Sequence, residues 1–174
     1  MSRIVGIVGS RSLPAAYAPL VASLVSSFRA RGFLVASGGA VGADQYALSA
    51  LLEQSASASG VIYSAWSSAD GFPAPVRPLV ASFLASGGQV VWGAGSSGAP
   101  RQQVVSALLG RNQRLVSACT VVVALLHGSS RGTLFTVREA VRRRLPVVVF
   151  LCGGGAQLPP DLFGRCFVIN KEVI

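Results

Sequence analysis

The sequence predicts an α/β fold, a Rossmann-like three-layer sandwich with a mostly parallel central sheet. Short apolar runs alternate with segments of helical periodicity, and Gly-rich turns separate the two kinds of segment. Hydrophobic residues make up 51% of the chain and charged residues only 12%. The alternation is typical of βαβ units, and the high apolar content is typical of strands that are buried on both faces.

Seven short runs are interpreted as strands, of which the segment Thr120–Leu126 is the clearest because it is almost entirely apolar. The last strand, in the C-terminal tail, is the weakest pattern. The predicted strands are Arg3–Val8, Phe33–Ala36, Val61–Ser64, Gln89–Trp92, Thr120–Leu126, Pro146–Cys152 and Cys166–Ile169.

Five segments between these runs have helical composition. Apolar side chains recur at i, i+3, i+4 and i+7 in Ala15–Arg31, and Gly32 follows at the position typical of a helix C-terminus. The fourth segment is helical either throughout or with a break at Gly110, because glycine is a poor helix former. The predicted helices are Ala15–Arg31, Ala43–Gln54, Leu79–Ala85, Arg101–Ala118 and Thr133–Arg144. With no repeat or long linker, residues 1–174 are expected to form one domain.

Several classes of protein are not expected. The longest apolar runs are about strand length, far short of the ~20 residues of a membrane helix, and the N-terminus does not have the pattern of a signal peptide. We therefore predict a cytoplasmic protein. Cys119, Cys152 and Cys166 match no metal-ligand spacing, so we expect buried free thiols, no metal and no cofactor.

The chain carries a net charge of +9, and all 15 of its basic residues except Lys171 are arginine. An excess of arginine favours bidentate contact with phosphate, and hence an anionic partner. A GC-rich genome encodes Arg in place of Lys and would produce the same composition, so both interpretations of the arginine excess stay open.

The apolar content also predicts a homo-oligomer, in which a second copy of the chain covers part of the apolar surface.

Three Gly/Ser-rich loops share one design, because each follows a predicted strand and opens a helix. At the carboxyl edge of a parallel sheet such loops let a ligand approach the backbone closely, and the helix that follows offers free N–H groups to a phosphate. The alternative is that all three are only tight strand-to-helix turns. The residues proposed to bind phosphate are Gly9, Ser10, Arg11, Ser37, Gly38, Gly39, Gly42, Ser130, Gly132 and Thr133.

A fourth candidate is the segment Gly110–Arg114. Arg111 and Arg114 are spaced i, i+3 and would share one helical face, from which they could straddle adjacent phosphates, with Asn112 between them. The alternative is an exposed helix surface. Arg101 competes with Arg111 as the main phosphate contact.

These motifs, Gly9–Arg11, Ser37–Asp44, Arg111–Arg114 and Ser130–Thr136, resemble in order those of the DNA-processing protein A (DprA) family, over most of the chain. The wider SLOG superfamily also contains YpsA-related nucleotide sensors and the Lonely Guy phosphoribohydrolases. The resemblance implies an extended Rossmann fold, dimers, and binding of single-stranded DNA in a basic pocket. It implies a pocket lined by Arg11, Ser37, Gly38, Gly39, Arg111, Asn112 and Arg114, with Gly132 and Thr133 closing one side.

Three functions therefore compete: a non-catalytic protein that binds single-stranded DNA, a sensor or carrier of a nucleotide-derived small molecule, and a Lonely Guy-type hydrolase. The net charge of +9 and the Arg111/Arg114 pair favour the first function, which we expect. The absence of interleaved aromatic residues and of the accessory domains of DprA proteins favours the second. Lonely Guy enzymes need a glutamate where this chain has Phe135, and Glu139 is expected to pair with Arg142 or Arg143 instead.

The roles of four further side chains are less well defined by the sequence. Asp44 is expected to stabilise the first turn of its helix, and His127 to be a loop residue rather than a catalyst. Trp92 either stacks on a base or packs under a loop, and the role of Trp66 is left open.

Overall fold

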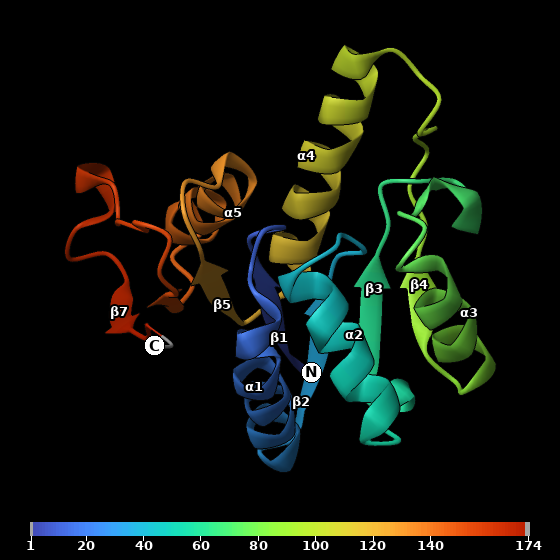
Figure 1. Ribbon diagram of the computed structural model, residues 1–174, viewed down its shortest axis with the longest axis horizontal. Helices are drawn as coiled ribbons and strands as arrows, with labels where there is room; N and C mark the ends of the chain where they lie inside the picture. The colour runs from blue at the N-terminus through green and yellow to red at the C-terminus, as the bar shows by residue number, and fades with distance from the viewer. Residues whose placement is uncertain (1, 173–174) are drawn as a thin grey trace.

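The computed structural model describes residues 2–172 and confirms the predicted fold class. All seven strands of its single sheet are parallel, in the order β4-β3-β2-β1-β5-β6-β7 (Figure 1). The strands are β1 Arg3–Gly9, β2 Phe33–Ser37, β3 Gly60–Tyr63, β4 Gln89–Val91, β5 Val121–Leu126, β6 Val147–Leu151 and β7 Phe167–Asn170. Each lies within two residues of its predicted ends, including the strand in the C-terminal tail.

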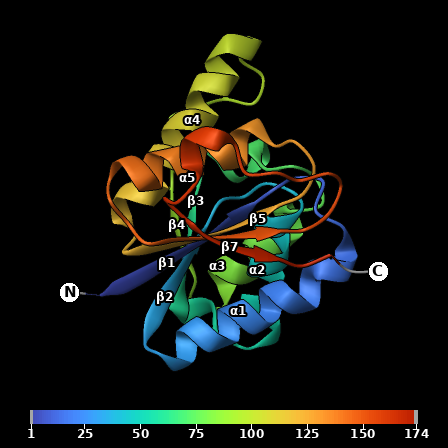
Figure 2. The same ribbon diagram turned by 90° about the vertical axis from the view of Figure 1, so that its left-hand side faces the viewer.

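Helices cover both faces of the sheet and complete the three layers. Helices α1, α2 and α3 lie on one face and α4 and α5 on the other, as the turned view in Figure 2 shows. The helices are α1 Ala18–Ala30, α2 Ala43–Glu53, α3 Arg77–Ala85, α4 Arg101–Ala118 and α5 Arg131–Arg142. The N-terminal half of α4 extends beyond the rest of the molecule in both views (Figures 1 and 2).

The first and fifth helix predictions need correction, and the alternative left open for the fourth is decided. The first predicted helix divides into a 3₁₀ turn at Ala15–Tyr17 and α1, because Pro19 fits the first turn of a helix but not its interior. The fourth helix runs through Gly110 without a break. The fifth begins at Arg131, two residues earlier than predicted, because Ser130 caps it by accepting a hydrogen bond from the Thr133 N–H.

The core consists of two hydrophobic clusters, one on each face of the sheet. Val25, Leu48 and Phe83 from the three helices of one face belong to the first, and Leu115 and Val137 from α4 and α5 belong to the second. The Val and Ile side chains of β1 and β5 contribute to both clusters, which is the double burial expected of central parallel strands. The central strands β2, β1 and β5 are therefore held firmly, and so are the loops at their carboxyl ends.

Cys119 and Cys152 are buried free thiols as predicted, and burial raises the pKa of Cys119 to about 12 and that of Cys152 to about 11. Cys166 is also a free thiol but is only half-buried. Among residues 2–172, no helix is both long and apolar enough to cross a membrane.

Candidate ligand-binding site

The three Gly/Ser-rich loops meet at one point of the carboxyl edge, because β2, β1 and β5 are neighbours in the sheet. Ser10 holds them together. Its N–H donates to the Leu125 carbonyl at 3.0 Å, its carbonyl accepts from the Ala43 N–H at 3.3 Å, and its hydroxyl accepts from the His127 N–H at 2.9 Å. Ser10 is 1% exposed, so its function here is to fix the loops rather than to contact a ligand.

A cavity of about 800 Å³ opens where these loops meet α4 and α5. Its wall combines polar and basic residues with large apolar side chains. The polar and basic lining includes Arg11, Ser12, Asp44, Arg101, Arg111, Asn112, Ser129, Ser130, Arg131, Thr133 and Thr136, and the larger apolar side chains are Val8, Val104, Val105, Leu108, Leu109, Leu115 and Phe135. Four arginines therefore face one carboxylate, which makes the cavity positively charged.

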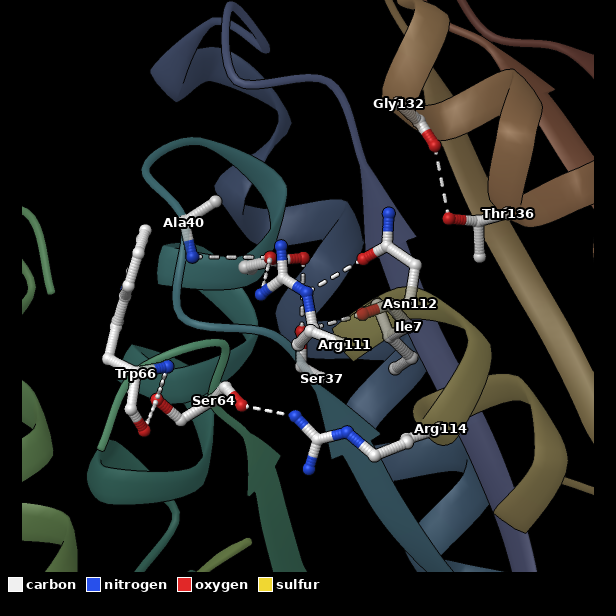
Figure 3. A network of polar contacts seen from close by, with 11 residues as sticks. Ile7, Ser37, Ala40, Ser64, Trp66, Arg111, Asn112, Arg114, Gly132 and Thr136 are labelled. Atoms are coloured by element: carbon white, nitrogen blue, oxygen red, sulfur yellow. Dashed lines mark hydrogen bonds and ion pairs between the residues drawn. The ribbon is translucent and has the colours of Figure 1, made fainter. Parts of the chain in front are cut away.

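A buried polar network forms the back of this cavity (Figure 3). The Ser37 hydroxyl donates to the Ile7 carbonyl at 2.7 Å and lies 3.2 Å from Asp44 Oδ1, and the Ala40 N–H donates to Asp44 Oδ2 at 3.3 Å. Arg111 reaches this carboxylate from α4, with 4.0 Å between Nη1 and Asp44 Oδ2. Asp44 therefore does more than stabilise its own helix, because it ties the loop after β2 to α4.

The charge of Arg111 is only partly compensated. Its side chain is buried, and burial lowers its pKa although Asp44 opposes this effect; Arg11 and Arg114 lower the pKa further. Burial also raises the pKa of Asp44 by more than Arg111 and the hydrogen bonds from Ala40 and Ser37 lower it. An anion in the cavity would therefore stabilise the charged form of Arg111.

Other parts of the chain occupy the space beside the glycines of the loop after β2. A Cβ on Gly38 would collide with Arg111, and a Cβ on Gly39 would collide with the ring of Phe72. Gly42 has a φ of 79°, which disfavours any other residue. Of these three, only Gly38 lines the cavity, so Gly39 and Gly42 have the packing role that was the alternative interpretation.

The N-terminus of α5 is accessible, in contrast to the packed loop after β2. Ser130 caps the helix, and a Cβ on Gly132 would find no atom within 4 Å. The first N–H groups of a helix have no partner within it, and they lie at the positive end of the helix dipole. Gly132 and Thr133 line the cavity at this point, so an anion can approach these groups without obstruction.

The structure brings most of the predicted site residues into this one cavity and separates the others from it. Ser37 is fully buried behind the wall, and Arg114 turns from α4 toward the ends of β3 and β4, where it donates to the Ser64 and Trp92 carbonyls at 2.6 and 3.2 Å. Arg114 therefore shares no cavity with Arg111, in contrast to the expected straddling pair. The predicted residues that line the cavity are Gly9, Arg11, Gly38, Arg111, Asn112, Ser130, Gly132 and Thr133.

Sequence reasoning missed the apolar wall of the cavity. Its α4 part is Val104, Val105, Leu108 and Leu109, a pattern of pairs four residues apart that was visible in the sequence and is typical of one helical face. Arg101 also lines the cavity, so both arginines that competed as the main phosphate contact are present.

Glu139 and His127, two side chains with a chemistry that could serve catalysis, both have structural partners. Glu139 is bound by both Arg142 and Arg143 at 2.8 Å, as expected, and Phe135 lines the cavity at the position where a Lonely Guy enzyme needs its glutamate. His127 Nδ1 lies 2.8 Å from the Cys152 carbonyl, which holds the ring against the neighbouring loop. Within residues 2–172, no three His, Cys, Asp or Glu side chains are grouped so that they could hold a metal ion.

Several solved structures share the fold. DNA processing protein A from Helicobacter pylori, described for its unique single-stranded DNA binding mode, is 18% identical with a TM-score of 0.71, over 95% of this chain and 74% of that one. The Streptococcus pneumoniae protein of the same name is 17% identical with a TM-score of 0.69, over 97% of this chain but only 58% of that one. The molybdenum cofactor binding protein from Rippkaea orientalis is 17% identical with a TM-score of 0.65, over 97% and 89%.

At these identities the structural likeness shows the fold alone, and no curated protein matches the sequence. A family model provides the stronger evidence. The model described as DNA recombination-mediator protein A matches residues 1–162, which confirms the resemblance carried by the four motifs. The chain belongs to the DNA recombination-mediator protein A family.

Proposed function

We propose that this protein binds single-stranded DNA, with phosphates at the N-terminus of α5 and beside Arg111. The observation that carries the proposal is the imbalance of charge in the cavity, where Arg11, Arg101, Arg111 and Arg131 face the single carboxylate of Asp44. Phosphate groups would neutralise these charges, and the arginine fork suits phosphate geometry. Family membership and the Helicobacter pylori protein support the same ligand.

The shape of the cavity supports a nucleotide chain rather than a free phosphate. Helix α4 contributes apolar side chains to the lining beside its own arginines, and Phe135 adds an aromatic ring. Bases of an unpaired strand are free to contact such a surface, whereas the bases of a duplex are stacked inside it. The basic loops would then hold the backbone while the α4 wall contacts one or two bases.

A carrier or sensor of a nucleotide-derived small molecule is the second candidate. The volume of about 800 Å³ lies within the range of small-molecule sites, and the apolar wall with a few polar groups is typical of them. The molybdenum cofactor binding protein from Rippkaea orientalis supports this candidate.

Fluorescence anisotropy separates the two candidates. A labelled single strand of about 20 nucleotides is titrated with protein at low salt, and bound strand is then challenged with unlabelled duplex and with nucleoside monophosphates. We expect sub-micromolar binding of the strand and little displacement by either competitor. An anisotropy that stays flat overturns DNA binding, and nucleoside monophosphate binding in calorimetry would then support the small-molecule candidate.

Arg11→Ala is the informative variant and Arg165→Ala its matched control. Both side chains are exposed, but only Arg11 lines the cavity. The two variants lose the same charge, so a weaker affinity in Arg11→Ala alone assigns binding to the cavity. An equal loss in both would show that net charge, not this site, attracts the strand.

We also propose that the protein forms a homo-oligomer that covers the edge of the sheet at β7. Phe167 and Val168 are 71% and 45% exposed on this edge strand, and the neighbouring Phe163 is 64% exposed. Exposed apolar edge strands readily pair with another chain. Sedimentation equilibrium at micromolar concentration is expected to detect a dimer or a larger species, and a monomer alone would contradict the proposal.

A further inference from the structure

A second cavity, of about 970 Å³, lies on the opposite side of α4 from the basic one. It lies between α4 and the loop that follows β4 and is open to solvent. Its lining includes Trp92, Gln102, Gln103, Ser106, Gly110 and Arg114. Because the two cavities use opposite faces of one helix, they share no lining residue.

Trp92 is the most distinctive residue of this cavity. Its side chain is 40% exposed, whereas the other tryptophan, Trp66, is 8% exposed. The ring is nevertheless held in place, because Phe72 packs against it edge-on with 6.0 Å between the ring centroids. A held and accessible indole is suited to stacking with a planar aromatic ligand.

The wall around Trp92 is formed before any ligand binds. The Gly93 N–H donates to the Trp66 carbonyl at 2.9 Å, and the Gly95 N–H donates to the Ala65 carbonyl at 2.9 Å. A Cβ on Gly95 would lie 2.6 Å from the same carbonyl oxygen, so the loop after β4 is packed tightly on the loop after β3. Binding here therefore requires little ordering of the chain.

The α4 side of the cavity is kept open by Gly110. This glycine lies in the middle of an 18-residue helix, where it is a poor helix former, and a Cβ on it would find no atom within 4 Å. No neighbour within the described chain therefore requires glycine at this position. Its effect is to leave the α4 side of the cavity that Trp92 also lines free of a side chain.

Arg114 provides a positive charge at the same place. Its guanidinium is oriented by the Ser64 and Trp92 carbonyls, which are neutral acceptors. Arg114 takes part in none of the ion pairs formed within residues 2–172. The cavity thus combines an exposed indole, two glutamine side chains that can donate and accept hydrogen bonds, and a cation without a carboxylate partner.

We propose that this second cavity is a nucleobase site, in which an unpaired base of the bound strand stacks on Trp92 while Arg114 attracts the phosphate beside it. The proposal rests on the proposed function, because the same strand occupies the basic cavity. A helix with its side chains is about 10 Å across, so a strand has to be several nucleotides long to reach both cavities. The site therefore contributes only to strands of at least that length.

Tryptophan fluorescence tests the proposal, with anisotropy as the independent measure of binding. A strand of about 20 thymidines and an abasic strand of equal length are each titrated into the protein and into Trp92→Ala and Trp92→Phe. We expect the thymidine strand to quench wild-type fluorescence and the abasic strand to leave it unchanged. Trp92→Ala is expected to bind the thymidine strand about tenfold more weakly and the abasic strand with unchanged affinity, with Trp92→Phe in between.

Gly110→Leu provides a second test that leaves Trp92 in place. The leucine side chain would occupy part of the cavity that Trp92 lines, and leucine favours a helix, so the fold is expected to be retained. We expect weaker binding of the thymidine strand and no quenching, while Gly110→Ala retains most of both.

The outcomes distinguish this site from the basic cavity. Strand binding with unquenched fluorescence, or equal losses for the thymidine and abasic strands in Trp92→Ala, overturns the nucleobase site and leaves the proposed function intact. If neither strand binds the wild-type protein, the proposed function fails and this inference fails with it.

Discussion

The loop after β2 and the loop that opens α5 have similar compositions but opposite surroundings. In the loop after β2, Gly38 and Gly39 face Arg111 and Phe72 at distances that leave no room for a Cβ. In the loop that opens α5, Gly132 faces open space. The first loop is thus packed against the rest of the chain, and the second is accessible at the mouth of the cavity.

The difference separates two uses of glycine that look alike in sequence. The packed loop positions Asp44 and Arg111 at the back of the cavity, so its effect on binding is indirect. The open loop presents helix N–H groups to solvent, where a phosphate can reach them directly. Substitutions in the packed loop should therefore lower stability, and substitutions in the open loop should lower affinity.

The largest expected effect is that of Arg111→Ala. The substitution leaves the Asp44 carboxylate buried without its cation, and breaking a buried ion pair costs about 3–5 kcal/mol of unfolding free energy. Arg131→Ala, which removes an exposed arginine from the same cavity, is expected to change stability by less than about 0.5 kcal/mol. Urea unfolding followed by circular dichroism measures both, and similar values would contradict the division between the two loops.

Gly39→Ala and Gly132→Ala add the same methyl group to each loop, so their effects on stability can be compared directly. The added methyl group collides with Phe72 at Gly39, for which we expect a loss of about 1–3 kcal/mol. At Gly132 the methyl group meets nothing and favours the helix, so stability should rise by about 0.5 kcal/mol while affinity for the strand falls. A destabilised Gly132→Ala would show that this end of α5 is packed in solution.

A smaller loss of stability than that of Gly39→Ala is expected at the cap of α5. Ser130→Ala removes the oxygen that accepts from the Thr133 N–H, and loss of such a cap costs about 1 kcal/mol. Ser129→Ala is the matched control, because Ser129 is exposed and precedes the cap. The difference between the thermal unfolding midpoints of the two variants measures the contribution of the Ser130 cap to stability. Equal midpoints would show that this cap does not stabilise α5.

The sequence was sufficient for the fold class and its elements. Alternating apolar runs and helical periodicity predicted every strand and the five α-helices to within a few residues, whereas the strand order that makes β2, β1 and β5 neighbours was not predicted. The split at Pro19 was missed because a proline in the first turn and a proline that divides a helical segment have the same local pattern.

The direction of side chains across the site could not be predicted in the same way. Arg111 and Arg114 are one turn apart on α4, yet one reaches Asp44 and the other the Ser64 carbonyl. Periodicity places both on the same side of an ideal helix, and only the position of the neighbouring strands decides which cavity each one faces. The packing roles of Gly39 and Gly42 likewise depend on residues distant in sequence.

The salt dependence of strand affinity tests the central claim most directly. We expect a steep log–log slope for the wild-type protein, reduced by about two in Arg11→Ala/Arg131→Ala, because each arginine that contacts a phosphate contributes about one to the slope. Arg165→Ala/Arg31→Ala loses the same charge outside the cavity and should retain the wild-type slope. Equal slopes in the two double variants would contradict a phosphate site at the open loop.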